Sequence, residues 1–378
     1  MVLIIPDGWH DVEDIFNMSQ GSPIRVLVLG SKGVGKSTFT RFFTGKLGPK
    51  IGALCRIETD CGQPDFSPPG VLNLAVLRNN EKIQVVSQRY VGFVTPSVNP
   101  IAYVECIEKL FKDYEGRFAN IPLIVNLHGW NMGMGRKTYE AAIHIIKPDF
   151  VVHIGSSKED PSFAVEPINP FISIFLPAPQ PSWLSLAPVV VLTDDEEGRC
   201  IASMTARDKR WVKYATHFRP DLVIRNEYKS AHPRDFFLSP FCRLLSLSKA
   251  SVSVSLPYAN TVPQDPFKLL EQLLVGLCNS ASGQCVCLGF VDSIDDEGVY
   301  VVIPPNIPKI MTDSIDEIVK GEMNWSPREQ ISYNGKTTST DFTTNPEGEP
   351  YFLTRVLVDD DIAKTASTRT NLGRKRLS

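Results

Sequence analysis

The sequence lacks a long apolar run that is free of proline, and its first residues lack the pattern of a secretory leader. The most apolar segment, residues 171–192, is interrupted by four prolines, each of which removes a helix donor and clashes with the preceding turn. The first ten residues are apolar only as far as Pro6 and have no basic flank. We therefore expect no membrane partner and no signal peptide. Residues 171–192 are expected to be an extended segment packed on the domain, with a short buried strand at 189–192.

The sequence also lacks closely paired cysteines, and its net charge is small. Its eight cysteines form no CxxC pair, so we expect buried free thiols in a reducing compartment and no zinc site. Cys285 and Cys287 alternate within an apolar run, which predicts that both lie on one face of a strand. The formal net charge of −3 indicates no nucleic-acid partner by itself. A local basic surface stays open, because only the charge near a groove acts on phosphate backbones.

The composition and the apolar pattern predict a folded α/β protein. The chain has 378 residues, of which 43% are hydrophobic and 21% charged, enough for two domains with their own cores. Strands are expected within 24–30, 51–60, 121–130 and 148–155, and helices within 36–47, 99–118 and 135–146. This alternation is typical of βαβ units in a mostly parallel sheet flanked by helices. Gly48-Pro49 is expected to end the first helix.

The chain carries one complete nucleotide-binding motif. "GSKGVGKS" fits G-x-x-x-x-G-K-[ST] and lies between a buried strand and the start of a helix, as a P-loop requires. Its backbone N–H groups are expected to surround phosphates at the positive end of the helix. The expected phosphate-binding residues are Gly30, Ser31, Lys32, Gly33, Val34, Gly35, Lys36, Ser37 and Thr38.

Two side chains of this motif have expected chemical roles, and a third has two interpretations. Lys36 is expected to bridge the β- and γ-phosphates, and the Ser37 hydroxyl to ligate Mg²⁺. Lys32 is either a solvated cation or a group that stabilises charge on the transferred phosphoryl.

An acidic stretch, "RIETDCGQPDFSPPG", follows one helix and one strand later. Asp60 ends that strand, which places it beside the phosphate loop of a doubly wound sheet. It could hold Mg²⁺ or accept a proton from a hydroxyl group. Glu58 could join the metal shell or pair with a basic neighbour. The spacing of Asp60 to Gln63 is one residue short of the GTPase DxxGQ motif, and residues 157–160 only loosely imitate a guanine-selecting box.

Taken together, these segments resemble the RNA-directed polynucleotide 5′-hydroxyl kinase family. The similarity is carried by "GSKGVGKSTF", "ETDCGQPDFSPPG", "TPSVNP" and "PLIVNLHGWNMGMG", and it continues in "ARDKRWVKYATHF" and "GFVDSIDDEGVYVVIPP". The nucleolar ribosomal-RNA-processing branch is the nearest, and the relative in the pre-mRNA cleavage complex is more distant. The chain differs in having Glu58 for an aspartate and Leu127 for a threonine. Relatives also carry a β-rich domain before the kinase core, whereas the first strand is expected here from Ile24.

The resemblance implies transfer of the ATP γ-phosphate, with Mg²⁺, to the 5′-hydroxyl of RNA, a ribosomal-RNA precursor being the expected substrate. The implied catalytic residues are Asp60, Lys36, Lys32, Arg210 and Arg207, with Ser37 and Asp60 on the metal. Both arginines belong to a lid that excludes water and adds positive charge, or are solvated helix residues.

The resemblance also implies substrate contacts and partners. Gln63, His128 and Trp130 are expected along the RNA strand, with Trp130 either stacking a base or capping the core. A nuclease or another processing-complex protein is an expected partner, in the nucleus and nucleolus. The alternative function is that of an ATP-bound scaffold subunit with little or no kinase activity.

The expected domain organisation follows from these assignments. Residues 1–23 are a lead-in, and residues 24–255 form a P-loop kinase domain of the NTPase type with a lid near 200–218. Residues 256–378 form a smaller β-rich or α+β domain, in which 283–305 reads as an antiparallel hairpin turning at 295–298. The chain ends in a basic tail, residues 374–376, read as a solvated tail or, alternatively, as a nuclear address or RNA contact.

Overall fold

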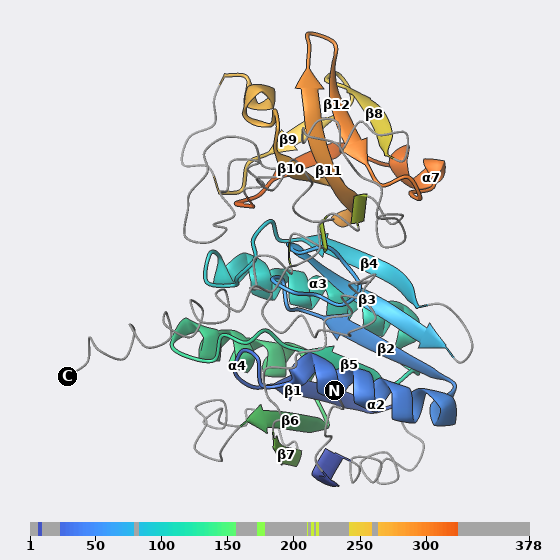
Figure 1. The fold of residues 1–378 in the computed structure, drawn as a ribbon, viewed down its shortest axis with the longest axis vertical. Helices are drawn as coiled ribbons and strands as arrows, with labels where there is room; N and C mark the ends of the chain where they lie inside the picture. Colours follow the sequence, from blue (N-terminus) through green and yellow to red (C-terminus); the bar gives the residue numbers. More distant parts are fainter. Residues whose placement is uncertain are drawn as a thin grey trace, which may run out of the picture.

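Two β-sheets of different construction make up the protein. The structure, a computed structural model, describes residues 7–9, 23–78, 83–155, 172–177, 210, 213–214, 217–218, 242–258 and 264–323. In Figure 1 the smaller sheet stacks on one end of the larger one. Among the helices of this part of the chain, none combines the length and apolar character needed to cross a bilayer. Residues 189–192 and the basic tail lie outside the described residues.

The larger sheet has seven strands in the order β4-β3-β2-β5-β1-β6-β7. Its parallel strands are β2 (Ala53–Glu58), β5 (Leu123–Asn126), β1 (Arg25–Leu29), β6 (Phe150–Gly155) and β7 (Ile172–Pro177). The two remaining strands, β3 (Val71–Arg78) and β4 (Gln84–Tyr90), are added antiparallel at one edge. The predicted mostly parallel sheet is confirmed, and the β3–β4 hairpin is an addition that the sequence reading did not contain.

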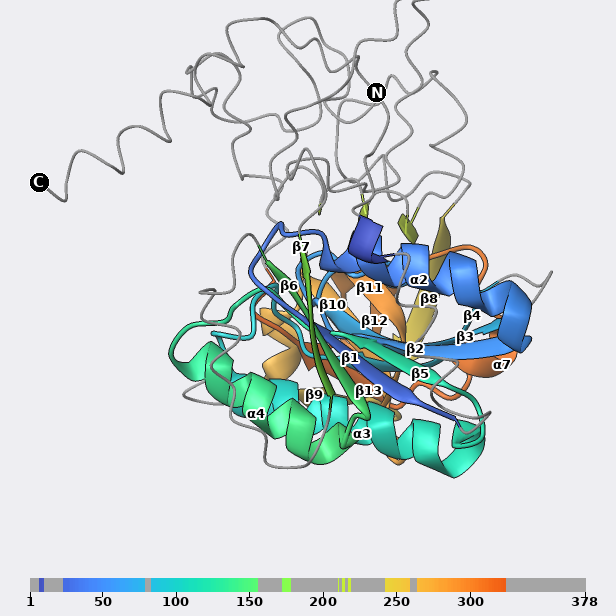
Figure 2. The same ribbon diagram turned by 90° about the horizontal axis from the view of Figure 1, so that it is seen from below.

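Helices cover both faces of this sheet. Figure 2 shows α2 (Lys36–Ile51) on one face and α3 (Pro100–Phe118) and α4 (Met134–Ile146) on the other. Each face buries its own apolar cluster: Phe39 and Phe43 of α2 pack in one, and Tyr103 of α3 and Tyr139 of α4 in the other. Because parallel strands leave both faces in need of cover, this three-layer arrangement follows from the continuous apolar strands.

The prediction that Gly48-Pro49 ends the first helix is wrong. The helix α2 includes Pro49 and ends at Ile51, before Gly52, whose φ of 78° and N–H bond to the Gly48 carbonyl (3.0 Å) close it. A proline removes only the donor to the carbonyl four residues earlier. That carbonyl belongs to Gly45, which is exposed to solvent, so the last turn tolerates the proline.

The short segment Asp7–Trp9 packs against α2. Residues Asp7–Trp9 form a short 3₁₀ turn, and Trp9 is fully buried. Its ring meets Phe39 edge-on at 5.2 Å and lies 5.8 Å from Phe42. The segment therefore completes the core beneath the first helix.

The smaller sheet has six strands in the order β8-β12-β11-β10-β13-β9. Its strands are β8 (Arg243–Ser248), β9 (Ser253–Ser255), β10 (Leu274–Asn279), β11 (Gln284–Ile294), β12 (Gly298–Ile303) and β13 (Glu317–Lys320). The short helices η4 (Pro266–Leu269) and α7 (Lys309–Thr312) accompany them. The predicted hairpin is β11–β12, and its turn is closed by Asp295 Oδ1, which accepts from the N–H groups of Glu297 (2.9 Å) and Gly298 (2.8 Å). The expected domain boundary near residue 255 lies at the end of β9. Because β8 and β9 already belong to the smaller sheet, that sheet begins before the expected boundary.

Cys285 and Cys287 lie on opposite faces of β11, which corrects the prediction of a shared face. Cys285 packs in the cluster that contains Phe290, and Cys287 packs in the cluster that contains Val275. The register of β10 with β11 shifts at Leu277/Cys278, and the extra residue of this β-bulge reverses the alternation of side chains. Both cysteines are buried free thiols.

Polar side chains join the two sheets. Arg89 on β4 donates to Asp113 Oδ2 of α3 (2.6 Å) and to the Ser282 carbonyl between β10 and β11 (2.5 Å). Gln284 Nε2 donates to Ser87 Oγ (2.9 Å) and to Asp113 Oδ2 (3.2 Å). Since Arg89 is 5% exposed, Asp113 is the counter-ion that keeps a buried charge paired.

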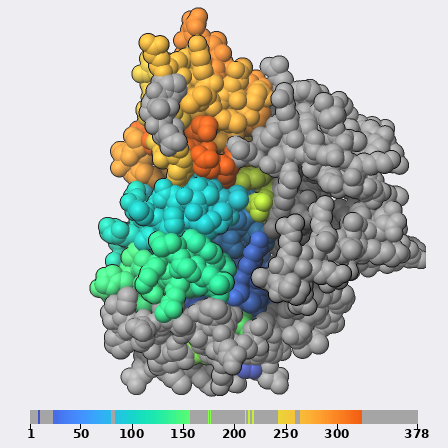
Figure 3. Space-filling view, turned by 90° about the vertical axis from the view of Figure 1, so that its left-hand side faces the viewer, coloured from blue at the N-terminus to red at the C-terminus, as the bar shows by residue number. Residues whose placement is uncertain are grey.

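Close backbone contacts bring the sheets together beside this cluster. A Cβ on Gly92 would lie 2.7 Å from Gly321 Cα, and a Cβ on Gly276 would lie 2.5 Å from the Tyr90 ring. The Glu322 N–H donates to the Gly92 carbonyl at 2.7 Å. Figure 3 shows the two units in contact on this side. Glycine is thus required where the two units touch.

We predict that Asp113→Ala destabilises the protein by about 2 kcal/mol, because it leaves the Arg89 guanidinium buried without its carboxylate. The matched control is Glu108→Ala on the same helix, which removes an exposed pair with Lys112 and is expected to cost less than about 0.5 kcal/mol. Urea unfolding of both variants measures the difference. Equal effects would contradict the assignment of Asp113 as the counter-ion.

Candidate active site

The phosphate loop connects β1 to α2 through three glycines with positive φ. The φ values are 144° at Gly30, 81° at Gly33 and 102° at Gly35, a region that other residues rarely adopt. A Cβ on Gly30 would also lie 2.1 Å from the carbonyl oxygen of Ile154 on β6. The loop can therefore follow this path only with glycine.

Lys36 is folded into the loop that it follows. Its side chain is 6% exposed, and Nζ donates to the carbonyls of Gly30 (2.8 Å) and Ser31 (2.9 Å). The helix behind it has no acidic residue in its first turn, so no carboxylate in that turn offsets the positive end of the helix dipole. A cation and a helix N-terminus thus converge on one short loop.

The loop after β5 packs directly on the phosphate loop. A Cβ on Gly129 would lie 2.6 Å from Lys32 Cα and 2.8 Å from its backbone nitrogen. Asn131 Nδ2 donates to Ser31 Oγ at 2.8 Å. The "HGW" residues and the phosphate loop therefore form one packed unit.

His128 is buried and holds this loop in place. Its Nδ1 accepts from the Trp130 N–H (3.0 Å), and Nε2 lies 2.7 Å from Thr138 Oγ1, which donates onward to the Gly135 carbonyl (2.6 Å). With Nδ1 as acceptor, Nε2 carries the proton. Burial, and then the charge of Lys36, lowers the pKa of His128 to about 3, so the ring is neutral at physiological pH.

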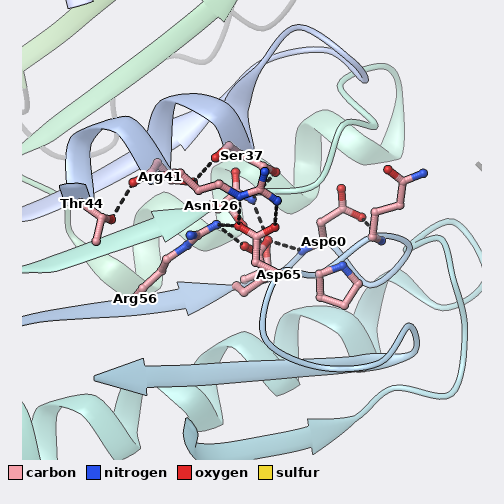
Figure 4. A network of polar contacts seen from close by, with 12 residues as sticks. Ser37, Arg41, Thr44, Arg56, Asp60, Asp65 and Asn126 are labelled. Atoms are coloured by element: carbon pink, nitrogen blue, oxygen red, sulfur yellow. Dashed lines mark hydrogen bonds and ion pairs between the residues drawn. The ribbon is translucent and has the colours of Figure 1, made fainter. Parts of the chain in front are cut away.

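A buried ion-pair network lies next to the start of α2 (Figure 4). Arg56 NH2 donates to Glu58 Oε2 (2.7 Å) and to Asp65 Oδ2 (2.5 Å), and Arg41 binds Asp65 through NH2 (2.5 Å) and Nε (3.1 Å). Burial alone would raise the pKa of Asp65, but Arg56 and Arg41 hold it below its ordinary value. The pKa of Glu58 is raised, because its burial outweighs its share of the Arg56 charge.

Two interpretations of Glu58 were open, a place in the metal shell and a pair with a basic neighbour. The side chain is fully buried and pairs with Arg56, so the ion pair is the one observed. Its second oxygen, Oε1, accepts from Asn126 Nδ2 (2.6 Å) and from the Asp60 N–H (3.3 Å).

Asp60 begins a tight turn beyond β2. Its Oδ1 accepts from the N–H groups of both Gly62 and Gln63, each at 3.0 Å. A Cβ on Gly62 would lie 2.7 Å from the Val94 carbonyl, so the turn also packs against the segment before α3. Lys213 donates to the Pro64 carbonyl on the other side of this turn.

Most of the residues predicted for the site lie close together. The phosphate loop, Asp60 and Gln63 lie at one edge of the sheet, where β1 and β2 end, and Trp130 lies on the loop packed against Lys32. Arg210 lies close enough to Cys61, beside Asp60, for its charge to oppose the burial that raises the pKa of that thiol. Arg207 lies outside the described residues.

The donor set at this edge fits Mg²⁺. Ser37 supplies a hydroxyl and Asp60 a carboxylate, which are the oxygen ligands that Mg²⁺ takes alongside phosphates and water. Beside Ser37, the buried Oδ1 of Asn126 accepts no hydrogen bond within the described ranges. Nowhere in that part of the chain do three or more His, Cys, Asp or Glu side chains gather as a metal cage, and a Mg²⁺–nucleotide site needs none.

Residues 30–180 match the family described as the P-loop of the mRNA cleavage and polyadenylation factor CLP1. This part of the chain is therefore similar to a Clp1 P-loop domain. Its fold is also that of solved Clp1 structures: the complex of wild-type Clp1p with Pcf11p has a TM-score of 0.58 and 14% identity, covering 84% of this chain and 78% of that one.

Curated proteins that are similar to this chain carry kinase names. The polynucleotide 5′-hydroxyl-kinase NOL9 of Arabidopsis thaliana is 24% identical over 352 residues, 84% of this chain and 90% of that protein. The polynucleotide 5′-hydroxyl-kinase GRC3 of Gibberella zeae is 31% identical over 179 residues, and that of Schizosaccharomyces pombe 28% over 178. The chain spans 25% and 24% of the length of these two fungal relatives. The family resemblance inferred from the motifs is thus confirmed.

Several residues of the site were missed by sequence reasoning, namely Arg41, Arg56, Asp65, Asn126, Asn131 and Lys213. One signal was available: Arg56 stands in an apolar strand, and a charge there requires a buried partner. The partners themselves come from other elements, so spacing along the chain could not identify them.

We predict that Gly129→Ala weakens nucleotide binding about tenfold. The new methyl group meets the Lys32 backbone, and overpacking of this kind costs about 1–3 kcal/mol, where 1.4 kcal/mol is a factor of ten in affinity. Titration with a fluorescent ATP analogue gives the affinity. Gly116→Ala in α3, where nothing lies within 4 Å, is the control and should bind as wild type. An unchanged affinity for Gly129→Ala would show that the two loops are not coupled.

We predict that His128 makes the protein less stable in acid. Its folded pKa of about 3 lies below the unfolded value of about 6.5, so unfolding takes up a proton between these values and stability falls as pH falls. From pH 7 to pH 5 this residue accounts for a loss of about 2 kcal/mol. Urea unfolding of His128→Gln should show that much less pH dependence. His144→Gln, on the exposed face of α4, should keep the wild-type slope, and an equal slope in both variants would refute the assignment.

Proposed function

We propose that the protein is a polynucleotide 5′-hydroxyl kinase that transfers the γ-phosphate of ATP to the 5′-hydroxyl of RNA. The observation that carries this proposal is the joining of the phosphate loop to the acidic turn. The Ser37 hydroxyl and the Asp60 backbone are connected through Asn126 and Glu58. A nucleotide-binding group and a carboxylate are therefore held in one rigid arrangement, which suits phosphoryl transfer by positioning and electrostatics.

In this proposal the cofactors are ATP and Mg²⁺. Lys36 and the N–H groups of the loop bind the β- and γ-phosphates, and Ser37 and Asp60 hold Mg²⁺. The bound ion neutralises charge on the phosphate oxygens. Lys32, with Arg210 and Arg207, adds positive charge beside the transferred group.

The acceptor side is assigned to the turn after β2 and to the loop after β5. Asp60 takes the proton from the RNA 5′-hydroxyl, as a general base must lie within hydrogen-bond reach of its substrate. Gln63 and Trp130 contact the RNA strand. His128 supports the Trp130 loop and does not contact the RNA itself, since both its ring nitrogens are engaged in holding that loop.

The kinase names of the relatives support a role in RNA processing, with a ribosomal-RNA precursor as substrate and the nucleus and nucleolus as location. A processing-complex protein, such as a nuclease, is the proposed partner. One observation favours the scaffold as a second candidate, because two solved structures of similar fold are of Clp1p with Pcf11p.

Transfer of labelled γ-phosphate to a 5′-hydroxyl oligoribonucleotide tests the kinase assignment. We expect Asp60→Asn to lower kcat by about 10²–10⁴, the contribution of a positioned general base. Lys36→Ala should lose about 10² or more through the charge removed from the transition state. Lys46→Ala, an exposed lysine on the same helix, is the control and should retain wild-type activity.

Two outcomes of this assay discriminate the candidates. Transfer abolished in the two site variants and kept in the control supports the kinase. Folded wild type that binds ATP and transfers nothing to RNA or to DNA supports the scaffold. A DNA substrate run in parallel defines the sugar preference, which the names of the relatives leave open.

A further inference from the structure

Asn126 is the last residue of β5 and occupies the centre of the parallel sheet. It pairs with Val28 of β1 on one side and with Glu58 of β2 on the other. Its side chain is fully buried, and its carbonyl accepts from the Thr59 N–H (3.1 Å) and from Thr59 Oγ1 (2.8 Å). The backbone on which this amide stands is therefore fixed on both sides.

The orientation of the Asn126 amide is set by Glu58. Nδ2 donates to Glu58 Oε1 at 2.6 Å and to Ser37 Oγ at 3.2 Å. The other oxygen of Glu58 is held by Arg56 at 2.7 Å. Both oxygens of Glu58 already accept, Oε2 from Arg56 and Oε1 from the Asp60 N–H, so the group acts as a carboxylate. A carboxylate only accepts, and the amide nitrogen of Asn126 therefore faces Glu58.

This orientation has two consequences at the start of α2, where Figure 4 shows Asn126 beside Ser37. The Ser37 hydroxyl oxygen receives a hydrogen bond from Asn126, which holds its side chain and leaves its remaining lone pair in a defined direction. The amide oxygen of Asn126, on the same side chain, is buried and accepts no hydrogen bond from the residues that the structure covers. A buried acceptor of this kind calls for a donor that the protein itself does not supply.

We propose that Asn126 is a positioning residue for Mg²⁺. Its Nδ2 orients the Ser37 hydroxyl toward the ion, and its Oδ1 accepts from a water molecule of the ion's shell. The inference deepens the proposed nucleotide-binding site and depends on it. Partners that orient a metal ligand typically change metal affinity by 10–100-fold when removed.

The neighbouring strand offers a matched control. Asn73 on β3 pairs with Glu58 in the sheet register, is fully buried and also has an Oδ1 that accepts no bond in the described part of the chain. Its Nδ2 donates to Ser67 Oγ (2.8 Å) in place of Ser37. The two asparagines therefore share burial and chemistry and differ in the hydroxyl that they hold.

The test measures the affinity of a fluorescent non-hydrolysable ATP analogue, once with Mg²⁺ and once with EDTA. We expect Asn126→Leu to weaken the Mg²⁺-dependent affinity by about tenfold or more and the affinity in EDTA by less than about twofold. Asn73→Leu should leave the ratio of the two affinities as in wild type. Where a leucine variant does not fold, Asn126→Ala and Asn73→Ala give the same comparison.

A double-mutant cycle with Ser37→Ala tests the route of the effect. The measured quantity is the ratio of the affinities with Mg²⁺ and with EDTA. If Asn126 acts through the Ser37 hydroxyl and the shared ion, Asn126→Leu should lower this ratio far less in the Ser37→Ala background than in the wild type. An unchanged Mg²⁺ dependence in Asn126→Leu would overturn the inference, as would equal losses with Mg²⁺ and with EDTA. This test measures binding and not phosphoryl transfer. A wild type that binds ATP in a Mg²⁺-dependent way but has no kinase activity would therefore refute the proposed kinase function without refuting this inference.

Discussion

The positive charge of Arg56 is the constraint on which the arrangement of the site depends. Its side chain is 1% exposed, and a charge so buried must be paired, since removal of one partner from such a pair is strongly destabilising. It satisfies this need by binding both Glu58 and Asp65. Glu58 then holds Asn126, and Asp65 holds Arg41, so one guanidinium fixes β2, β5, α2 and the acidic turn relative to one another.

The parts of the site that could be predicted are those whose signal is local. The phosphate loop was recognisable because two glycines, a lysine and a serine occur at fixed spacing between a strand and a helix. The positive φ values of Gly30 and Gly35 are the physical reason why glycine stands at those two positions. Asp60 was placed beside the loop because parallel strands end at the same edge. The β11–β12 hairpin followed in the same way from apolar runs around an Asp–Gly turn.

What could not be predicted depends on contacts between distant segments or on a single inserted residue. The strands β3 and β4 interrupt the βαβ alternation, and their pairing is a property of the sheet edge. The face on which Cys287 lies depends on a bulge that the alternation of apolar residues does not reveal. Asn126 looked like one more polar residue at a strand end, and its role emerges only when β5 lies between β1 and β2.

The seam between the two sheets determines how the protein can come apart. Gln284 and Ser282 belong to the smaller sheet, yet they bond to Ser87, Arg89 and Asp113 of the larger one, and the cluster around Phe290 takes in Val71 from the other side. Neither sheet can therefore open alone without exposing an ion pair and apolar surface that it shares with its neighbour. We therefore expect the two sheets to unfold together, so that a substitution in this seam lowers the stability of the sheet that carries the nucleotide site.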